Sequence, residues 1–303
     1  MALESIESRS FESLLRQEVH DQACWEVAHE SERFLRSYAL LPETNQGRYI
    51  SADAFKELFP PYAASKAGRN VFNAPVHNAA AVLAAEQFRH RLKARDNRRH
   101  VLFVTGIPGA GKTCAFAGRD PDGYRLVYER QLSDLVEAEK KIRETLEADL
   151  IPSILVIDCE PERALRNTFA RFKAEGRGAS LNAMASIQAG LPDTLRSLVA
   201  LYPGRISLSA IYLDNGHAPE AISGDIFSRI TRGSAHEIES RLIAELAVLG
   251  QEQKLGDAYI QQCRGHAPNA RSIRDAGKHA RTSEGIARQA EIPADGFSYD
   301  QSC

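Results

Sequence analysis

The sequence contains little cysteine, almost no charge imbalance and no long apolar run. Its five cysteines (Cys24, Cys114, Cys159, Cys263 and Cys303) show no CxxC or Cys/His spacing in 303 residues. This pattern argues against a zinc site and against a disulfide framework. Basic and acidic residues nearly cancel, 38 against 40, so no overall field attracts nucleic acid or an anionic membrane. Any anion that the protein binds must be held by a local site.

No segment approaches the length of a membrane span, and the N-terminal stretch "MALESIESRSFESLLRQEV" lacks the apolar core of a signal peptide. We therefore expect a cytoplasmic bacterial protein with no membrane and no nucleic-acid partner. Secretion into another cell by a route that needs no such signal stays open.

The first hundred residues predict helices around one short strand. Apolar side chains recur at helical spacing over residues 2–39, with a break near Asp21. A strand around Tyr49 and Ile50 runs into a helix that Ser51 or Asp53 caps and Pro60-Pro61 ends. Residues 74–95 form a strong further helix.

Four apolar runs then predict the strands of an α/β fold, at residues 100–105, 124–129, 153–159 and 205–213. Helical segments separate them, which calls for a parallel sheet flanked by helices. We expect a helical extension over residues 1–45, an α/β core like that of P-loop kinases over 46–216, and a helical region with a loose tail over 217–303.

The stretch "GIPGAGKT" matches the phosphate-binding loop G-x-x-x-x-G-K-[ST] in full, directly after the strand 100–105. Backbone N–H groups of such a loop surround the phosphates of ATP, the lysine contacts the β- and γ-phosphates, and the threonine binds Mg²⁺. The predicted nucleotide-binding residues are Gly106, Ile107, Pro108, Gly109, Ala110, Gly111, Lys112, Thr113 and Cys114. The helix that follows is expected to be short, because "GRDPDG" is typical of a turn.

Two further features bear on the chemistry. Asp158 ends an apolar strand, where it is either a Mg²⁺ ligand or an ordinary helix cap. Arginines recur along "ERALRNTFARFKAEGRG", which predicts either a cluster of guanidinium groups over the transferring phosphate or a solvated basic helix face. Neither feature alone separates a kinase from a motor or a switch.

The phosphate loop, these arginines and "SADAFKELFPPY" together resemble the zeta-toxin family of P-loop kinases. The resemblance covers residues 46–216, and only the phosphate loop is specific by itself. It implies Asp53 as the general base in a DxFK motif, with Lys112, Arg166 and Arg171 as the other catalytic residues. It also implies Lys56, His77 and Glu129 as substrate-binding residues and Arg177 and Asn215, which follows Asp214, as nucleotide-binding residues.

The order of the motifs departs from the family pattern, since Asp53 precedes Lys112 here and follows it in most members. Catalysis needs proximity in space and not in sequence. A sheet accommodates the change if the strand near Ile50 lies beside the strand 100–105. Asp53 has a structural alternative as a helix N-cap.

The sequence thus predicts an ATP- and Mg²⁺-dependent small-molecule kinase. By resemblance, the substrate is a nucleotide-linked metabolite such as UDP-N-acetylglucosamine or NAD, and modification of a central metabolite suggests an antitoxin or chaperone partner. Two alternatives stay open. One is a nucleotide-dependent switch read by a partner protein, and the other is a decayed kinase, to which Arg130 and the short helix point.

Overall fold

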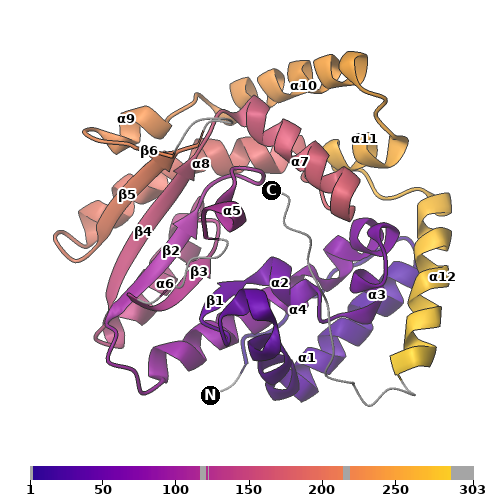
Figure 1. The fold of residues 1–303 in the computed structure, drawn as a ribbon, viewed down its shortest axis with the longest axis horizontal. Coiled ribbons are helices and arrows are strands. Elements are labelled where there is room, and N and C mark those ends of the chain that lie inside the picture. Colours follow the sequence, from indigo (N-terminus) through magenta and orange to yellow (C-terminus); the bar gives the residue numbers. More distant parts are fainter. Residues whose placement is uncertain (1–2, 117–120, 122, 214–218, 288–303) are drawn as a thin grey trace.

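A six-stranded, mostly parallel sheet forms the centre of the molecule (Figure 1). The computed structural model describes residues 3–116, 121, 123–213 and 219–287. The strand order is β1-β3-β2-β4-β5-β6, and only the pair β5–β6 is antiparallel. The strands are β1 (Tyr49–Ser51), β2 (His100–Thr105), β3 (Tyr124–Glu129), β4 (Ile151–Asp158), β5 (Ser207–Tyr212) and β6 (Glu220–Ala221).

β2, β3 and β4 form because their side chains are buried on both faces of the sheet, whereas β5 has exposed serines, Ser207 and Ser209, on one face. Val101 and Phe103 of β2 point into one hydrophobic cluster, and Leu102 and Val104 point into the other. Successive residues of a strand face opposite sides, so a strand covered by helices on both sides has a continuously apolar sequence. The apolar runs therefore predicted these strands to within two residues at each end.

Helices cover both faces of the sheet, which gives a three-layer α/β/α arrangement. The first cluster joins the sheet to α1 (Leu14–Leu40), α4 (Lys66–Lys93), α6 (Leu135–Glu147) and α12 (Ala270–Ala287). The second joins it to α7 (Pro161–Glu175), α10 (Ala235–Glu252) and α11 (Asp257–Cys263). The long helix α8 (Leu181–Leu201) contributes to both clusters. Short elements complete the fold: η1 (Pro42–Thr44), α2 (Ala52–Lys56), α3 (Pro60–Ala63), α5 (Lys112–Phe116) and α9 (Ile226–Ile230).

Several local predictions were wrong. The N-terminal segment does consist of two helical stretches, but they meet at a kink at Glu30 and not at a break near Asp21. Pro60 and Pro61 begin α3, where a proline in the first turn needs no N–H partner, and α2 has already ended at Lys56. Residues 274–287, which fall within the last thirty or so residues expected to be loose, belong to α12, which packs on α3 and α4.

The position of β1 also differs from the expectation. β1 pairs with β3 and lies one strand away from β2. All three strands are parallel, so their carboxyl ends still meet at one edge of the sheet. Ser51 at the end of β1 is level with Glu129, and Glu129 is level with Val104 near the end of β2.

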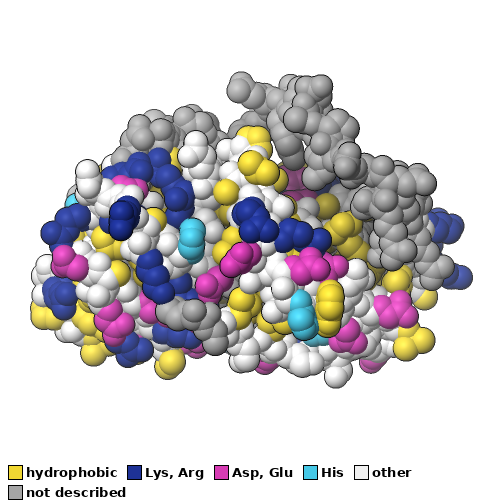
Figure 2. All heavy atoms as spheres, turned by 90° about the horizontal axis from the view of Figure 1, so that it is seen from below, with side chains coloured by type: hydrophobic (Ala, Val, Ile, Leu, Met, Phe, Trp, Pro, Cys, Tyr) yellow, Lys and Arg dark blue, Asp and Glu magenta, His cyan; other side chains and the backbone are white. Residues whose placement is uncertain are grey.

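The surface carries intermixed charges, as the nearly balanced composition requires. Figure 2 shows Lys and Arg side chains interspersed with Asp and Glu over one face of the molecule. Within the described ranges, no helix is long and apolar enough to cross a membrane.

Candidate functional site

The phosphate loop between β2 and α5 has a backbone that glycine alone adopts easily. Gly106, Gly109 and Gly111 have φ values of 145°, 84° and 91°. A Cβ atom on Gly106 would lie 2.3 Å from the carbonyl oxygen of Ile157, and one on Gly109 would lie 2.2 Å from that of Ala164. The loop is therefore pressed against β4 and α7, and it retains the open backbone cradle that suits a phosphate group.

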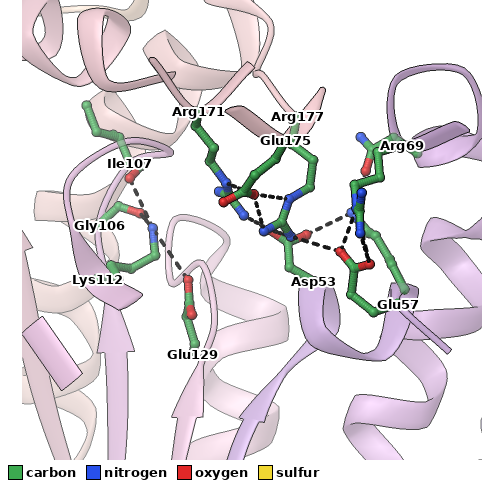
Figure 3. Close-up of polar contacts among 12 residues, drawn as sticks. Asp53, Glu57, Arg69, Gly106, Ile107, Lys112, Glu129, Arg171, Glu175 and Arg177 are labelled. Atoms are coloured by element: carbon green, nitrogen blue, oxygen red, sulfur yellow. Dashed lines mark hydrogen bonds and ion pairs between the residues drawn. The ribbon is translucent and has the colours of Figure 1, made fainter. Parts of the chain in front are cut away.

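Lys112 curls over this loop. Its Nζ donates to the carbonyl oxygens of Gly106 at 2.9 Å and Ile107 at 3.0 Å, and lies 3.9 Å from Oε1 of Glu129 (Figure 3). Burial lowers the pKa of Lys112, while the charges of Glu129 and Asp53 oppose that shift. The ammonium group is thus held by weak carbonyl acceptors at the position where phosphate oxygens would be stronger ones.

Asp53 lies inside α2 and is not its N-cap, since Ser51 holds that position. Its carboxylate accepts from Lys56 Nζ at 2.9 Å and from Arg171 Nη2 at 3.4 Å, and Nη1 of Arg177 is 4.0 Å away. The charge of Lys56, helped by those of Arg171 and Arg177, holds the pKa of Asp53 well below its usual range. Asp53 is therefore a carboxylate surrounded by three cations, with 44% of its side chain still exposed.

Arg171 and Arg177 reach Asp53 from the end of α7 and the loop after it. Glu175 binds both, accepting from Arg171 Nε at 3.3 Å and Arg177 Nη2 at 2.6 Å (Figure 3). Arg177 also lies 3.9 Å from Glu57, which pairs with Arg69. We call Asp53, Arg171, Glu175 and Arg177 the arginine cluster.

Gly176 shapes the turn that carries Arg177. It ends α7 with φ 83°, and a Cβ atom there would lie 2.1 Å from the carbonyl oxygen of Lys66 at the start of α4. α7 and α4 therefore meet backbone to backbone at this point. This contact sets the position of the Arg177 guanidinium group in the arginine cluster.

Arg166 takes no part in the arginine cluster, contrary to the predicted pairing with Arg171. It binds Glu245 and Glu252 of α10, the latter at 2.7 Å. Arg163, which belongs to the same arginine pattern, donates to the carbonyl oxygen of Leu213. Of the arginines in α7, Arg171 is the one that the described structure brings to Asp53.

Asp158, the predicted metal ligand, is buried at the end of β4 and pairs with Arg232 at 2.5 Å. Burial raises the pKa of Asp158 to about 6, although Arg232 opposes the shift. Arg232 also lies 3.3 Å from Glu160. In the ranges that the structure covers, no three His, Cys, Asp or Glu side chains gather as a metal site. Mg²⁺ that is bound with a nucleotide usually takes one or two carboxylates together with phosphate oxygens and waters, and in this structure Arg232 pairs with the Asp158 carboxylate.

The predicted substrate residues lie around Asp53 and Lys112. Lys56 is nearly buried and also donates to Asn73 Oδ1 at 2.8 Å. His77 keeps surface in contact with solvent, yet the surrounding protein and the charge of Lys56 lower its pKa to about 4. Glu129 accepts from the Tyr49 hydroxyl at 2.6 Å. Asn215 and Asp214 lie outside the described residues, as does the side chain of Cys114.

Sequence reasoning did not single out Glu175 or Asn73, and it placed Tyr49 in the strand before Asp53 without linking it to Glu129. Glu175 is four residues from Arg171 on one helix, a spacing that favours an ion pair and was visible in the sequence. Asn73 and Tyr49 carried no such signal, because their partners lie on elements distant in sequence.

Two hollows in the surface are lined by none of the residues of the arginine cluster, although Gly176, between Glu175 and Arg177, lines the first. One of about 380 Å³ lies between the ends of α7 and α11, against Phe172 and Tyr259. The other, of about 690 Å³, lies between α8, α10 and α11. Neither is lined by Asp53, Lys112 or Arg171.

Comparison with known proteins gives little. No protein-family model matches the chain, and no curated protein matches it. Among solved structures, the native AvrRxo1-ORF1:-ORF2 complex is similar with a TM-score of 0.37 and 11% identity, over 96% of this chain and 97% of that one. A likeness at this level supports no conclusion about function, which has to be argued from the site.

Proposed function

We propose that the protein is a kinase of zeta-toxin type, which transfers the γ-phosphate of ATP to a hydroxyl group of a small nucleotide-linked metabolite. One observation carries the proposal. Asp53 and Arg171 are 118 residues apart in sequence and meet at 3.4 Å. They do so at the carboxyl edge of the parallel sheet, the edge at which α/β proteins bind their ligands, and the charges of both act on Lys112 of the phosphate loop.

The charges of the cluster suit phosphoryl transfer. Lys112, Arg171 and Arg177 supply fixed positive groups on the side of Asp53 that faces the phosphate loop (Figure 3). Preorganised cations stabilise the charge on a transferring phosphoryl group without reorganising during the reaction. Glu175 keeps both arginines oriented through its two ion pairs.

Asp53 would accept a hydrogen bond, and finally the proton, from the acceptor hydroxyl. Its depressed pKa makes it a weak base. A weak base suffices because the phosphoryl-transfer transition state is loose and requires little proton removal before it. The exposed part of the Asp53 carboxylate leaves room for an acceptor group.

The phosphate loop fits a nucleotide because a Cβ atom at Gly106 or Gly109 would collide with the backbone behind it. When bound, Mg²⁺ neutralises β- and γ-phosphate oxygens. Thr113 would bind the ion, and Lys112 would exchange its carbonyl acceptors for phosphate oxygens.

The test is to incubate the purified protein with γ-labelled ATP, Mg²⁺ and a panel of nucleotide sugars, NAD and nucleosides, and to search by mass spectrometry for a product heavier by one phosphate. Asp53→Asn should lower kcat about 10²–10⁴-fold while ATP affinity stays near that of the wild type. Asp193→Asn is the matched control, because Asp193 is 82% exposed and pairs only with Arg196 among the described residues.

A nucleotide-dependent switch gives a different result in the same experiment. It would bind ATP and form no product in any variant, and Asp53→Asn would change only its stability. If Asp53→Asn formed the product at the wild-type rate, Asp53 would have no part in the mechanism, although the protein would still be a kinase.

We also infer a protein partner that restrains the enzyme, because phosphorylation of a central metabolite would harm the host cell. Expression of the chain alone should slow growth, and Lys112→Ala should relieve the effect. High-level expression without a growth defect and without ATP consumption would contradict this inference.

A further inference from the structure

The smaller of the two surface hollows gathers lysines that have no carboxylate partner. It has a volume of about 380 Å³ and is lined by Lys66 of α4, Lys173 of α7 and Lys254, which lies between α10 and α11. Among the described residues, none of the three forms an ion pair. By contrast, four other lysines of the chain are paired with carboxylates: Lys56, Lys112, Lys140 and Lys141. We call this hollow the lysine pocket.

The local charge of the lysine pocket is positive, because Asp275 is the one carboxylate among its lining residues. The end of α7 accounts for part of this charge. Lys66 Nζ donates to the carbonyl oxygen of Lys173 at 3.0 Å, one of the carbonyl groups that a helix leaves free at its C-terminus. An ammonium group has three N–H donors, so Lys66 keeps two for a ligand. Lys254 has no comparable contact in the part of the chain that the structure describes.

Aromatic rings form the apolar wall of the lysine pocket. Tyr259 is fully buried, and its ring centre lies 5.2 Å from that of Phe172 and 4.9 Å from that of Phe169. This packing holds the half-buried Phe172 at the wall. An aromatic face beside ammonium groups suits a ligand that combines a flat ring with a phosphate, because any base can stack on the ring and lysine binds phosphate as a point charge.

Two polar side chains complete the lining. Asn70 and Ser272 both face the lysine pocket, and within the described ranges neither side chain forms a hydrogen bond. An amide and a hydroxyl group can hydrogen-bond to the edge of a base or to a ribose. The volume lies within the range of roughly 300–1,000 Å³ that is typical of small-molecule sites.

We propose that the lysine pocket binds a nucleotide, with the base against Phe172 and the phosphate among the three lysines. The site is separate from the phosphate loop, since none of residues 106–113 lines it. It adjoins the arginine cluster, because Gly176 lines the pocket and lies between Glu175 and Arg177.

Two sources share this ligand chemistry. One is the nucleotide part of the acceptor metabolite, which rests on the proposed function, and the other is a free nucleotide that acts as an effector. Binding itself depends on neither phosphate transfer nor the phosphate loop, so it can be measured independently of both.

Calorimetry with AMP and UMP as probes tests binding to the full-length protein and to three variants: Lys112→Ala in the phosphate loop, Lys173→Gln/Lys254→Gln, and Phe172→Leu. The matched control is Lys140→Gln/Arg143→Gln, which removes the same charge from α6, where both side chains are partly exposed. Circular dichroism checks that each variant is folded.

We expect at least one probe to bind the wild type and to bind Lys112→Ala with the same Kd. The double lysine variant should raise that Kd about 10-fold or more, because charged hydrogen bonds to the phosphate are lost. Phe172→Leu should raise it about 5-fold or more through the loss of stacking. The control on α6 should leave it unchanged.

The proposal is overturned if neither probe binds, or if Lys112→Ala abolishes binding that the double lysine variant retains. Equal weakening by the double lysine variant and by the control would overturn it as well, because general charge would then be the cause. If Phe172→Leu does not fold, the double lysine variant decides, since both of its lysines are exposed.

Kinetics distinguish the two sources. A higher KM for the acceptor with an unchanged KM for ATP in the double lysine variant identifies the acceptor's nucleotide part, whereas a change in kcat on addition of AMP or UMP without competition against the acceptor identifies an effector. Binding in the lysine pocket of a protein that phosphorylates nothing would sustain this inference and end the kinase proposal. Phosphorylation by a protein that binds neither probe would do the reverse.

Discussion

Arg166 and Arg171 show that residue type alone does not predict which side chains reach the candidate site. The two are five positions apart on α7, which places them about 140° apart around a helix of 3.6 residues per turn. Arg171 reaches Asp53, and Arg166 turns to the acidic residues of α10. A separation of about 140° already places the two arginines on different faces of the helix. The resemblance to a family of kinases nevertheless led both to be predicted as catalytic residues.

The same substitution in both arginines tests this difference. Arg171→Ala should lower kcat about 10²–10³-fold, as expected for the loss of a fixed charge beside the transferring group. Arg166→Ala should leave kcat near the wild-type value and cost at most about 1 kcal/mol of stability, because its ion pairs are partly exposed. Steady-state kinetics and urea denaturation measure both effects, and equal losses of kcat would contradict the placement of Arg166.

His77 predicts a pH dependence of stability. Its pKa falls from 6.5 to about 4 on folding, because desolvation by the surrounding protein and then the charge of Lys56 disfavour the protonated ring. The side chain is exposed, so solvent screening reduces the effect on stability to a fraction of that shift. Between pH 6.5 and about 4 the His77 ring binds a proton in the unfolded chain but stays neutral in the folded chain. The free energy of unfolding therefore decreases as the pH falls through this range. Urea denaturation at pH 7 and pH 5 should show a smaller decrease for His77→Asn than for the wild type. Identical decreases would show that His77 titrates alike in both states.

At the scale of elements, the close backbone contact between α7 and α4 at Gly176 should make substitution of this glycine destabilising. Gly176→Ala would combine a left-handed backbone with a collision against Lys66, and we expect a loss of about 2–5 kcal/mol. Gly204→Ala is the matched control, since Gly204 has φ 70° and open space around it, and should cost about 1–2 kcal/mol. Urea denaturation measures both. Equal costs would mean that the backbone contact with Lys66 relaxes freely.

Elements differ in how far the sequence predicts them. Three of the long strands, β2, β3 and β4, were evident because burial on both faces leaves a continuously apolar run. The pairing of β1 with β3 could not be predicted, because a strand of three residues carries no pattern that identifies the neighbouring strand. No prediction covered α8, and α12 was missed because its polar sequence resembles a loose tail until α3 and α4 cover one of its faces.

For the candidate site, the glycine positions of the phosphate loop could be predicted, because the loop backbone requires positive φ at Gly106, Gly109 and Gly111. Nucleotide binding by this loop stays a prediction. Asp53 and Arg171 were predicted by resemblance, and the structure brings them together. Of the partners that hold them, Lys56 lies three residues from Asp53 and Glu175 four residues from Arg171, spacings that the sequence shows. Asn73, which holds Lys56 from α4, could not be predicted, because contacts between distant elements depend on the topology of the whole fold.

At the scale of the whole molecule, the first cluster joins the N-terminal helix to the sheet. Val27, Phe34 and Tyr38 of α1 belong to the same core as Phe103 of β2 and Ile154 of β4. The segment expected as an extension over residues 1–45 therefore packs as part of the core.

This packing predicts a single unfolding transition. Trp25 is the only tryptophan of the chain, lies on α1 and stacks on His29. Its fluorescence reports on the N-terminal helix, and far-UV circular dichroism reports on all helices. The two urea transitions should coincide if the core is cooperative. A fluorescence change at lower urea would show that α1 unfolds on its own.

The candidate site is built from two stretches of the chain, one that contains β1 and one that contains β3. Asp53, Lys56 and His77 precede the loop around Asn97, while Lys112, Arg171 and Arg177 follow it. A chain cut at Asn97 would leave each fragment with an incomplete set of reacting groups. If the protein is the proposed kinase, phosphate transfer would then report reassembly of the two pieces, so that the molecule could serve as a complementation sensor whose signal depends on a shared sheet.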